Sequence, residues 1–320
     1  MRGLAALWVV LHHAKQSTDH FLGPIGEVSI IANGNLGVNF FFILSGFIIA
    51  YSASRMLESG KGVMDYALSR ATRIYVPYLP IGLGVYCLYI MLPGLSQADR
   101  ETSFLTSATL LPAYNPPALS VAWTLVHEMI FYVVYALIFI SKRVLFGALI
   151  IWLFAIIYVD HEKIEIIRPL RYLLSPFNLL FMIGVVVFNL SNLIKSVGLW
   201  SWLLMGLGVF VVVFEATQGY PNHLSIAIGF SLIIFAAVSG EISERKAIRP
   251  LMILGSASYA IYLVHNPVLS IAVRAVDKVF PGANIWMGFW MIVFASVVSG
   301  LMYWKVYETK ALTKVRAWLA

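Results

Sequence analysis

Ten apolar segments, separated by polar stretches, organise this sequence of 320 residues. A helix of about 20 apolar residues crosses the hydrocarbon core of a lipid bilayer. Apolar residues make up 60% of the chain and charged residues only 12%, whereas soluble domains carry about 25% charged residues. We therefore expect an all-α integral membrane protein, a bundle of about ten transmembrane helices. This composition excludes a soluble enzyme or a nucleic-acid-binding protein. The segments are Gly3–Ala14, Gly37–Ser52, Ile74–Leu92, Leu119–Ile140, Val144–Val159, Leu174–Leu190, Val197–Phe214, Leu224–Ser239, Leu251–Val273 and Ile285–Tyr307.

The segments are expected to form one domain over residues 1–320, since no linker, repeat or low-complexity stretch divides them. The single cysteine, Cys87, lies inside an apolar segment and excludes an intrachain disulfide. The first segment, Gly3–Ala14, is short, because it covers about 18 Å of a hydrocarbon core of about 30 Å. Arg2 also follows Met1 directly. Two explanations stay open: a short first span, or a natural start upstream that leaves the first helix truncated here.

The lysines and arginines are distributed unevenly over the alternating loops. Positive charge favours the cytoplasmic side of a membrane protein. With ten spans, 15 of the 22 lysines and arginines fall on the side of the two termini and seven on the other side. We therefore expect both termini in the cytoplasm. The larger set is Arg2, Arg55, Lys61, Arg70, Arg73, Lys142, Arg143, Lys195, Arg245, Lys246, Arg249, Lys305, Lys310, Lys314 and Arg316, and the smaller set is Lys15, Arg100, Lys163, Arg168, Arg171, Arg274 and Lys278.

Three ionisable residues in or directly before the first apolar segment are candidates for catalysis or ligand binding: Arg2, His12 and His13. Arg2 and His13 are eleven residues apart, which places them on one helix face and about 16 Å apart along its axis. Ionisable groups within apolar spans are costly and are often functional, and a histidine accepts a proton from a hydroxyl near neutral pH. Two interpretations stay open: a general base, or two solvated histidines at the membrane interface.

Arg70 and Arg73 stand on one helix face just before the third apolar segment, on the expected cytoplasmic side. Two neighbouring guanidinium groups suit a ligand that carries phosphates, because each binds two oxygens at once. The alternative is that they only follow the tendency of basic residues to gather at cytoplasmic helix ends.

Glu128 lies in the middle of an apolar segment, with His127 beside it and with Thr124 and Tyr132 one turn away on either side. An unpaired carboxylate there is costly, so we expect a partner such as a histidine or arginine from another helix. The interpretations are a functional carboxylate or a structural salt bridge.

Ser258, Tyr262 and His265 form a polar stripe along one helix face before Pro267, where the helix is expected to break. Hydrogen bonds between packed helices explain Ser258 and Tyr262. For His265, a functional role and an interfacial role stay open. The sequence contains no pattern of metal ligands, and no metal is expected.

Five short motifs follow one another along the chain. They are RGLAAL from Arg2 with His13 behind it; GVNFFFILSGFII from Gly37 to Ile49; Arg70 and Arg73 before RIYVPY; Trp123, Thr124, Leu125, Glu128, Phe131 and Tyr132; and Gly255, Ser258, Tyr259, Tyr262, Leu263, His265 and Pro267. In this order, the motifs resemble the membrane-bound acyltransferase-3 family, in its stand-alone form that acetylates exopolysaccharides or O-antigens. The resemblance covers almost the whole chain.

Three positions depart from the family pattern. Asn39 stands where an aspartate is frequent, which puts a charge role there in doubt, and Thr124 replaces a common serine. The residues that usually precede the first arginine are absent before Arg2.

The resemblance implies an O-acetyltransferase of the plasma (inner) membrane of a bacterium. It would move an acetyl or other short acyl group from cytoplasmic acyl-coenzyme A, the donor cosubstrate, to a hydroxyl of a cell-surface glycan or of its lipid-linked precursor. No bound cofactor and no nucleic-acid partner are implied. The residue roles that follow are His13 and Glu128 as catalytic residues, Arg2, Arg70 and Arg73 as donor-binding residues, and His12, Trp123, Tyr132, Ser258, Tyr259, Tyr262 and His265 as further candidates.

A proton-coupled transporter of a small solute is the alternative from another class, because transporters also use ionisable groups within the membrane. Many transporters contain paired repeats with broken helices at matching positions, and this sequence contains no such pair.

Overall fold

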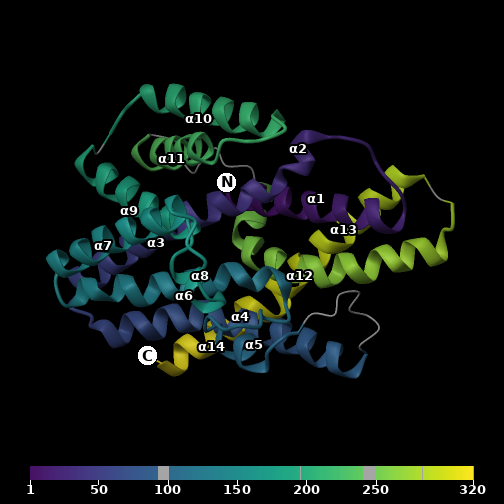
Figure 1. The fold of residues 1–320 in the computed structure, drawn as a ribbon, viewed down its shortest axis with the longest axis horizontal. Helices are drawn as coiled ribbons and strands as arrows, with labels where there is room; N and C mark the ends of the chain where they lie inside the picture. The colour runs from purple at the N-terminus through teal and green to yellow at the C-terminus, as the bar shows by residue number, and fades with distance from the viewer. Residues whose placement is uncertain (93–100, 195, 241–248, 283, 320) are drawn as a thin grey trace. The chain divides into compact units, whose positions relative to one another are not determined.

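The computed structural model describes residues 1–92, 101–194, 196–240, 249–282 and 284–319, and within them the chain is folded almost entirely into helices (Figure 1). Each of the ten predicted apolar segments is largely helical, so the all-α prediction is confirmed. The helices are α1 (Arg2–Phe21), α2 (Ser29–Ala32), α3 (Gly37–Glu58), α4 (Val63–Met91), α5 (Phe104–Thr109), α6 (Trp123–Tyr135), α7 (Lys142–His161), α8 (Arg168–Leu173), α9 (Phe177–Leu193), α10 (Trp200–Thr217), α11 (His223–Ser239), α12 (Arg249–Val279), α13 (Ile285–Tyr303) and α14 (Thr309–Leu319).

Among the described residues, eight helical stretches are long and apolar enough to cross a membrane. The helix α11 is apolar but shorter, and α1 is not among the eight. These stretches are consistent with an integral membrane protein of many spans. They are Gly34–Glu58, Val63–Met91, Ser120–Phe139, Lys142–His161, Arg168–Leu193, Trp200–Thr217, Arg249–Val279 and Ile285–Leu319. Four basic residues used to predict the orientation, Arg100, Lys195, Arg245 and Lys246, lie outside the described residues.

The first helix is longer than its apolar segment. It continues past Ala14 to Phe21 and has 20 residues, which corresponds to about 30 Å. Its second half is polar, and there Lys15 forms an ion pair of 2.5 Å with Asp19 one turn later. A pair at this spacing supports a helix that apolar residues alone do not predict. The first helix therefore extends beyond the apolar segment that the sequence marks, and a short first span stays a prediction.

The predicted break of the helix at Pro267 is wrong, because the helix continues past this residue. The helix α12 runs through Pro267 to Val279. A proline removes one backbone donor, but helices packed against others in membrane proteins tolerate this loss. Leu263, the residue four positions earlier, is fully buried.

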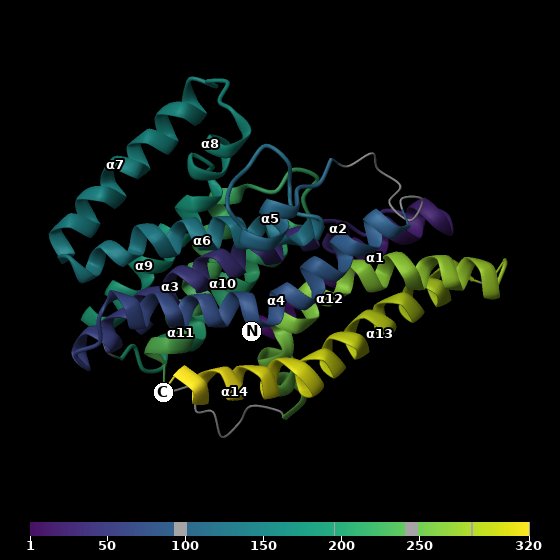
Figure 2. The ribbon, with the colours of Figure 1, turned by 90° about the horizontal axis from the view of Figure 1, so that it is seen from below.

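The chain divides into two compact units, and each has its own packing. The first unit comprises residues 1–41, 203–230 and 241–320. Within its described part, α12 and α13 lie side by side along much of their length (Figure 2), and α1 packs against both. Gly3 permits this approach, since a Cβ there would lie 2.7 Å from backbone and side-chain atoms of Leu254. The buried core between these helices consists of Ala6, Val10, Ala14, Ile25, Ala257, Ile261, Leu269, Val273, Val276, Phe289, Ile292 and Val293.

The second unit comprises residues 42–202 and 231–240. Its helices α3 and α9 cross at two glycines. A Cβ on Gly46 would lie 2.0 Å from the carbonyl oxygen of Phe181, and a Cβ on Gly184 would lie 2.0 Å from that of Ile43. Small residues allow this close backbone packing in membrane proteins. Beside the crossing, the Phe181 ring stacks on Phe131 of α6 with 4.9 Å between ring centroids.

Candidate functional site

His13 and His265 meet where α1 packs against α12 in the first unit. Nε2 of His265 lies 3.3 Å from Nδ1 of His13, and the ring centroids are 5.1 Å apart. His265 is fully buried, whereas His13 is only partly buried. His13 and His265 are separate candidates from opposite ends of the sequence, and the structure brings them into direct contact.

The hydrogen bonds of this pair define which ring nitrogens carry protons. A carbonyl oxygen only accepts, so the contact of His265 Nδ1 with the Tyr262 carbonyl oxygen, at 2.7 Å, requires Nδ1–H. The contact of His13 Nδ1 with the Val9 carbonyl oxygen, at 3.0 Å, requires the same there. In the neutral pair, the single Nδ1–H of His13 is therefore shared between the Val9 carbonyl oxygen and His265 Nε2, and His13 Nε2 carries a lone pair. No described residue forms a hydrogen bond to His13 Nε2.

This arrangement suits a base. A hydroxyl that approaches His13 Nε2 can give up its proton to that nitrogen. The imidazolium so formed keeps its Nδ1–H directed at His265 Nε2, whose lone pair stabilises the charge in a buried environment. His265 thus orients His13 and stabilises its protonated form.

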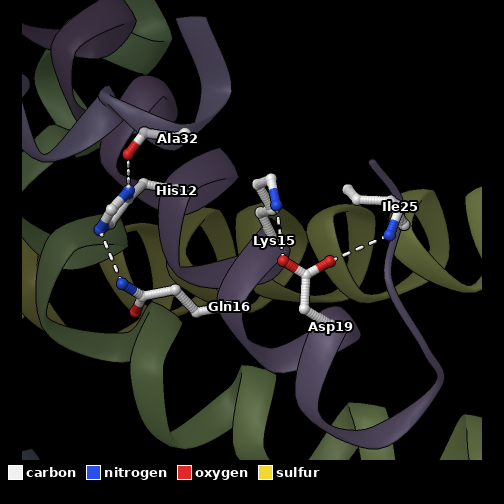
Figure 3. A network of polar contacts seen from close by, with 6 residues as sticks. All are labelled: His12, Lys15, Gln16, Asp19, Ile25 and Ala32. Atoms are coloured by element: carbon white, nitrogen blue, oxygen red, sulfur yellow. Dashed lines mark hydrogen bonds and ion pairs between the residues drawn. The ribbon is translucent and has the colours of Figure 1, made fainter. Parts of the chain in front are cut away.

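His12 forms hydrogen bonds through both ring nitrogens and so differs from His13 (Figure 3). Its Nδ1 donates to the carbonyl oxygen of Ala32 at 2.6 Å, and its Nε2 accepts from the side-chain amide of Gln16 at 3.0 Å. Both ring nitrogens are therefore engaged, and His12 ties α1 to α2. Trp8 strengthens the same connection, because its ring N–H donates to the carbonyl oxygen of Ile30 at 2.5 Å. Of the two adjacent histidines, the geometry favours His13 for chemistry.

The other candidates in the first unit lie on the same two helices, α1 and α12. Ser258 donates to the carbonyl oxygen of Gly255 in its own helix at 2.8 Å, which fits a structural role. Tyr262 is buried, and its ring centroid lies 5.6 Å from that of His265. Tyr259 is buried as well. Arg2 begins α1, on the helix face that carries His13.

A second cluster lies in the second unit, around Arg70 of α4. Nη2 of Arg70 donates to the hydroxyl of Ser52 in α3 at 2.9 Å. The guanidinium carbon lies 5.8 Å from the ring centroids of both Tyr66 and Tyr132, within the range of a cation–π contact. The Tyr66 hydroxyl donates to the carbonyl oxygen of Tyr132 at 3.4 Å. Three helices, α3, α4 and α6, thus hold this arginine.

Glu128 has a different partner from the one predicted. The hydroxyl of Tyr132, one turn along α6, donates to Oε1 of Glu128 at 2.6 Å. No histidine or arginine of the described residues forms an ion pair with Glu128. A tyrosine at this spacing reaches the carboxylate within one helix, so no partner from another helix is needed. Because the Tyr132 ring faces Arg70, the two motifs that carry these residues form one cluster.

The guanidinium of Arg70 retains unused binding capacity. Its Nε is buried and has no hydrogen-bond partner. A buried donor without a partner costs about 1–3 kcal/mol, and an anionic oxygen would satisfy it. Arg73 follows one turn later on α4 and is partly exposed. Anion binding by Arg70 and Arg73 stays a prediction, and the buried Nε of Arg70 is the position where an anionic oxygen would be bound.

Sequence reasoning missed Ser52 and Tyr66 in this cluster. Tyr66 stands four residues before Arg70, a spacing that places the two on one helix face and is visible in the sequence. Ser52 lies on another helix, and its contact depends on the packing of α3 against α4. Trp123, the remaining candidate, begins α6 and has its ring centroid 5.1 Å from that of Phe177.

Comparison with known proteins finds relatives that match most of the chain. A family described as an acyltransferase domain matches residues 1–304. The chain is 28% identical over 317 residues to the exopolysaccharide production protein ExoZ of Rhizobium meliloti (strain 1021), covering 92% of this chain and 90% of ExoZ. It is 25% identical over 352 residues to the acyltransferase MdmB of Streptomyces mycarofaciens, covering 95% of this chain and 88% of MdmB. No solved structure matches.

Proposed function

Since this chain belongs to the acyltransferase-3 family and is a membrane acyltransferase, we propose that it is an O-acetyltransferase that uses acyl-coenzyme A. The acceptor is a hydroxyl of a cell-surface glycan or of its lipid-linked precursor. The name of ExoZ, an exopolysaccharide production protein, supports a glycan acceptor. The bacterial plasma membrane is the location that fits these relatives, which come from bacteria.

The observation that carries the proposed reaction is the His13–His265 pair. His13 Nε2 takes the proton of the acceptor hydroxyl while its oxygen attacks the thioester carbonyl carbon. A new C–O bond forms, the C–S bond breaks, and the thiolate of coenzyme A leaves. The thiolate then receives the proton from His13, which returns to its neutral form. One ester and one thiol result from one thioester and one hydroxyl.

Arg70, Arg73 and Arg2 would bind the phosphates of the donor. Arg70 supports this role because its Nε is buried without a partner, and a phosphate oxygen is a strong acceptor for a guanidinium. Glu128 acts through Tyr132, whose ring faces the Arg70 guanidinium. In this proposal, Glu128 and Tyr132 are positioning residues for Arg70.

The decisive experiment replaces His13 in the full chain. Membranes with His13→Ala are incubated with radiolabelled acetyl-coenzyme A and a glycan acceptor, and label in the glycan is counted. We expect transfer to fall by a factor of about 100 or more, since general-base catalysis contributes about 10²–10⁴-fold. His161→Ala is the matched control, because His161 is exposed on α7 with 80% of its side chain accessible.

If His13→Ala transferred acetyl groups at the wild-type rate, with normal amounts of folded protein, a catalytic role for His13 would be excluded. Family membership already favours an acyltransferase over a proton-coupled transporter. Proton-coupled uptake of a solute by the wild-type protein, with no label in any acceptor, would reverse that preference.

A further inference from the structure

An open pocket of about 370 Å³ lies in the second unit, apart from the Arg70 cluster. Its volume falls within the range of about 300–1,000 Å³ that is usual for small-molecule sites. Aromatic side chains and two guanidinium groups are prominent in its lining, among them Trp123, His127, Tyr172, Phe177, Arg168 and Arg171. The proposed acyl transfer assigns no role to this combination.

The aromatic wall is held in place by a buried amide. Nδ2 of Asn178 donates to the carbonyl oxygens of Tyr172 and Leu173 at 2.8 and 2.9 Å. Its Oδ1 is therefore directed at the ring of His127 and lies 3.1 Å from Nδ1. Asn178 is fully buried and His127 is 3% exposed. The connections fix α6, α8 and α9 to one another, so the wall is formed before any ligand binds.

The aromatic rings are close enough to form one surface. The Trp123 and Phe177 ring centroids are 5.1 Å apart, those of His127 and Tyr172 are 5.3 Å apart, and those of Trp123 and His127 are 5.7 Å apart. Aromatic faces of this kind pack against flat apolar groups, and the C–H face of a sugar ring is such a group.

The two arginines add positive charge at the open side. Arg168 donates to the carbonyl oxygen of Tyr114 at 3.2 Å, and Arg171 donates to that of Ile166 at 3.1 Å. Each guanidinium has five N–H donors, and among the described residues neither arginine pairs with a carboxylate. Both remain exposed. The pair can therefore bind an anion bidentately.

The position along α6 distinguishes this pocket from the donor site. Trp123 and His127 stand at the beginning of α6, whereas Tyr132, which faces Arg70, lies about 7.5 Å further along the axis than His127. The charge distribution of the sequence predicts that Arg168 and Arg171 lie on the side of the membrane opposite to Arg70 and Arg73. Coenzyme A is a cytoplasmic molecule, so in the proposed function its phosphates bind at Arg70 and not in this pocket.

We propose, on the basis of the acyl transfer proposed above, that this pocket binds an acidic sugar residue of the acceptor glycan. The sugar ring packs on the aromatic wall of Trp123 and Phe177, and its carboxylate is bound by Arg168 and Arg171. The acceptor is then an acidic polysaccharide or its acidic precursor, held on the side of the membrane opposite to the donor.

The test measures binding to the full chain in lipid nanodiscs by calorimetry. The probes are an oligoglucuronate and the same oligomer after carboxyl reduction, which differ in charge but not in linkage. We expect the carboxylated oligomer to bind about tenfold more tightly or better, as a charge-assisted bidentate contact provides. Arg168→Gln or Arg171→Gln reduces this preference, and Arg143→Gln, which changes an exposed arginine elsewhere in the same unit, does not.

Equal binding of the two oligomers, or an unchanged preference in both pocket variants, overturns the assignment. Competition by coenzyme A, together with weaker coenzyme A binding in Arg168→Gln, also overturns it, because the pocket is then a donor site. Acetyl transfer from acetyl-coenzyme A is measured in the same preparations. Loss of transfer to every acceptor with a retained carboxylate preference contradicts the proposed function and not the pocket.

Discussion

Nε2 of His265 lies 3.3 Å from Nδ1 of His13, although 252 positions separate the two residues in the sequence. The packing of α1 against α12 creates this contact, so the proposed base depends on both ends of the chain. His265 is fully buried, and it acts on the acceptor only through His13. A change at His265 should therefore affect the chemical step more than donor binding.

The first prediction compares His265→Gln with His265→Leu. A glutamine side chain retains an oxygen that can accept from His13 Nδ1–H, whereas leucine has no acceptor. We expect kcat to fall about 100-fold in His265→Leu and about tenfold or less in His265→Gln, with KM for acetyl-coenzyme A unchanged in both. Kinetics with labelled donor measure this difference. Equal losses in two well-folded variants would contradict a hydrogen-bonding role for His265.

The second prediction concerns Arg70. Lysine keeps the positive charge but lacks the planar group that reaches Ser52 and an anion together. Arg70→Lys should raise KM for acetyl-coenzyme A about tenfold and change kcat little. Arg55→Lys is the control, because Arg55 is exposed on α3 and, among the described residues, forms an ion pair only with Glu58. An unchanged KM in Arg70→Lys would exclude Arg70 from donor binding.

The third prediction concerns the Tyr132–Glu128 hydrogen bond. Tyr132→Phe removes a bond of 2.6 Å to a carboxylate, so the free energy of unfolding should fall by about 1–3 kcal/mol. Tyr66→Phe removes only a contact of 3.4 Å to a backbone oxygen and should have a smaller effect. Thermal unfolding in detergent tests whether Tyr132→Phe loses more stability than Tyr66→Phe. A larger loss in Tyr66→Phe would contradict it.

The fourth prediction concerns the crossing of α3 and α9. Gly46→Ala or Gly184→Ala places a methyl group 2.0 Å from a backbone oxygen, which the helices relieve only by moving apart. We expect a lower Tm and less folded protein in the membrane. Gly84→Ala and Gly147→Ala are matched controls on helices of the same unit, where a Cβ meets nothing within 4 Å. These controls should be neutral or stabilising by about 1 kcal/mol. Normal folding of Gly46→Ala would show that the crossing tolerates a wider spacing.

The positions of the helices were predictable because long apolar stretches leave the backbone few alternatives in a bilayer. The polar end of α1 was not, since its helix beyond Ala14 is supported by the Lys15–Asp19 pair and by contacts with α12. The continuation of α12 through Pro267 was missed for a related reason. Packing against neighbouring helices overrides the local preference of a proline.

The candidate site was predictable as a set of residue types but not as a set of contacts. His12 and His13 are equivalent in the sequence, and only the contacts with Ala32 and Gln16 distinguish them. Glu128 was expected to pair with another helix, and Tyr132 of its own helix takes that place. Arg168 was interpreted only as a loop charge, because nothing local connects it to Trp123.

The close crossing at Gly46 and Gly184 has a consequence for biosynthesis. About 140 residues separate the two glycines, so at about 5–20 residues per second a ribosome makes Gly184 roughly 7–30 seconds after Gly46. During that interval, the face of α3 that later packs against α9 is in contact with lipid or with another protein. A nascent chain with α3 inserted and α9 not yet synthesised is therefore the stage at which an insertase or a membrane chaperone has this surface to bind.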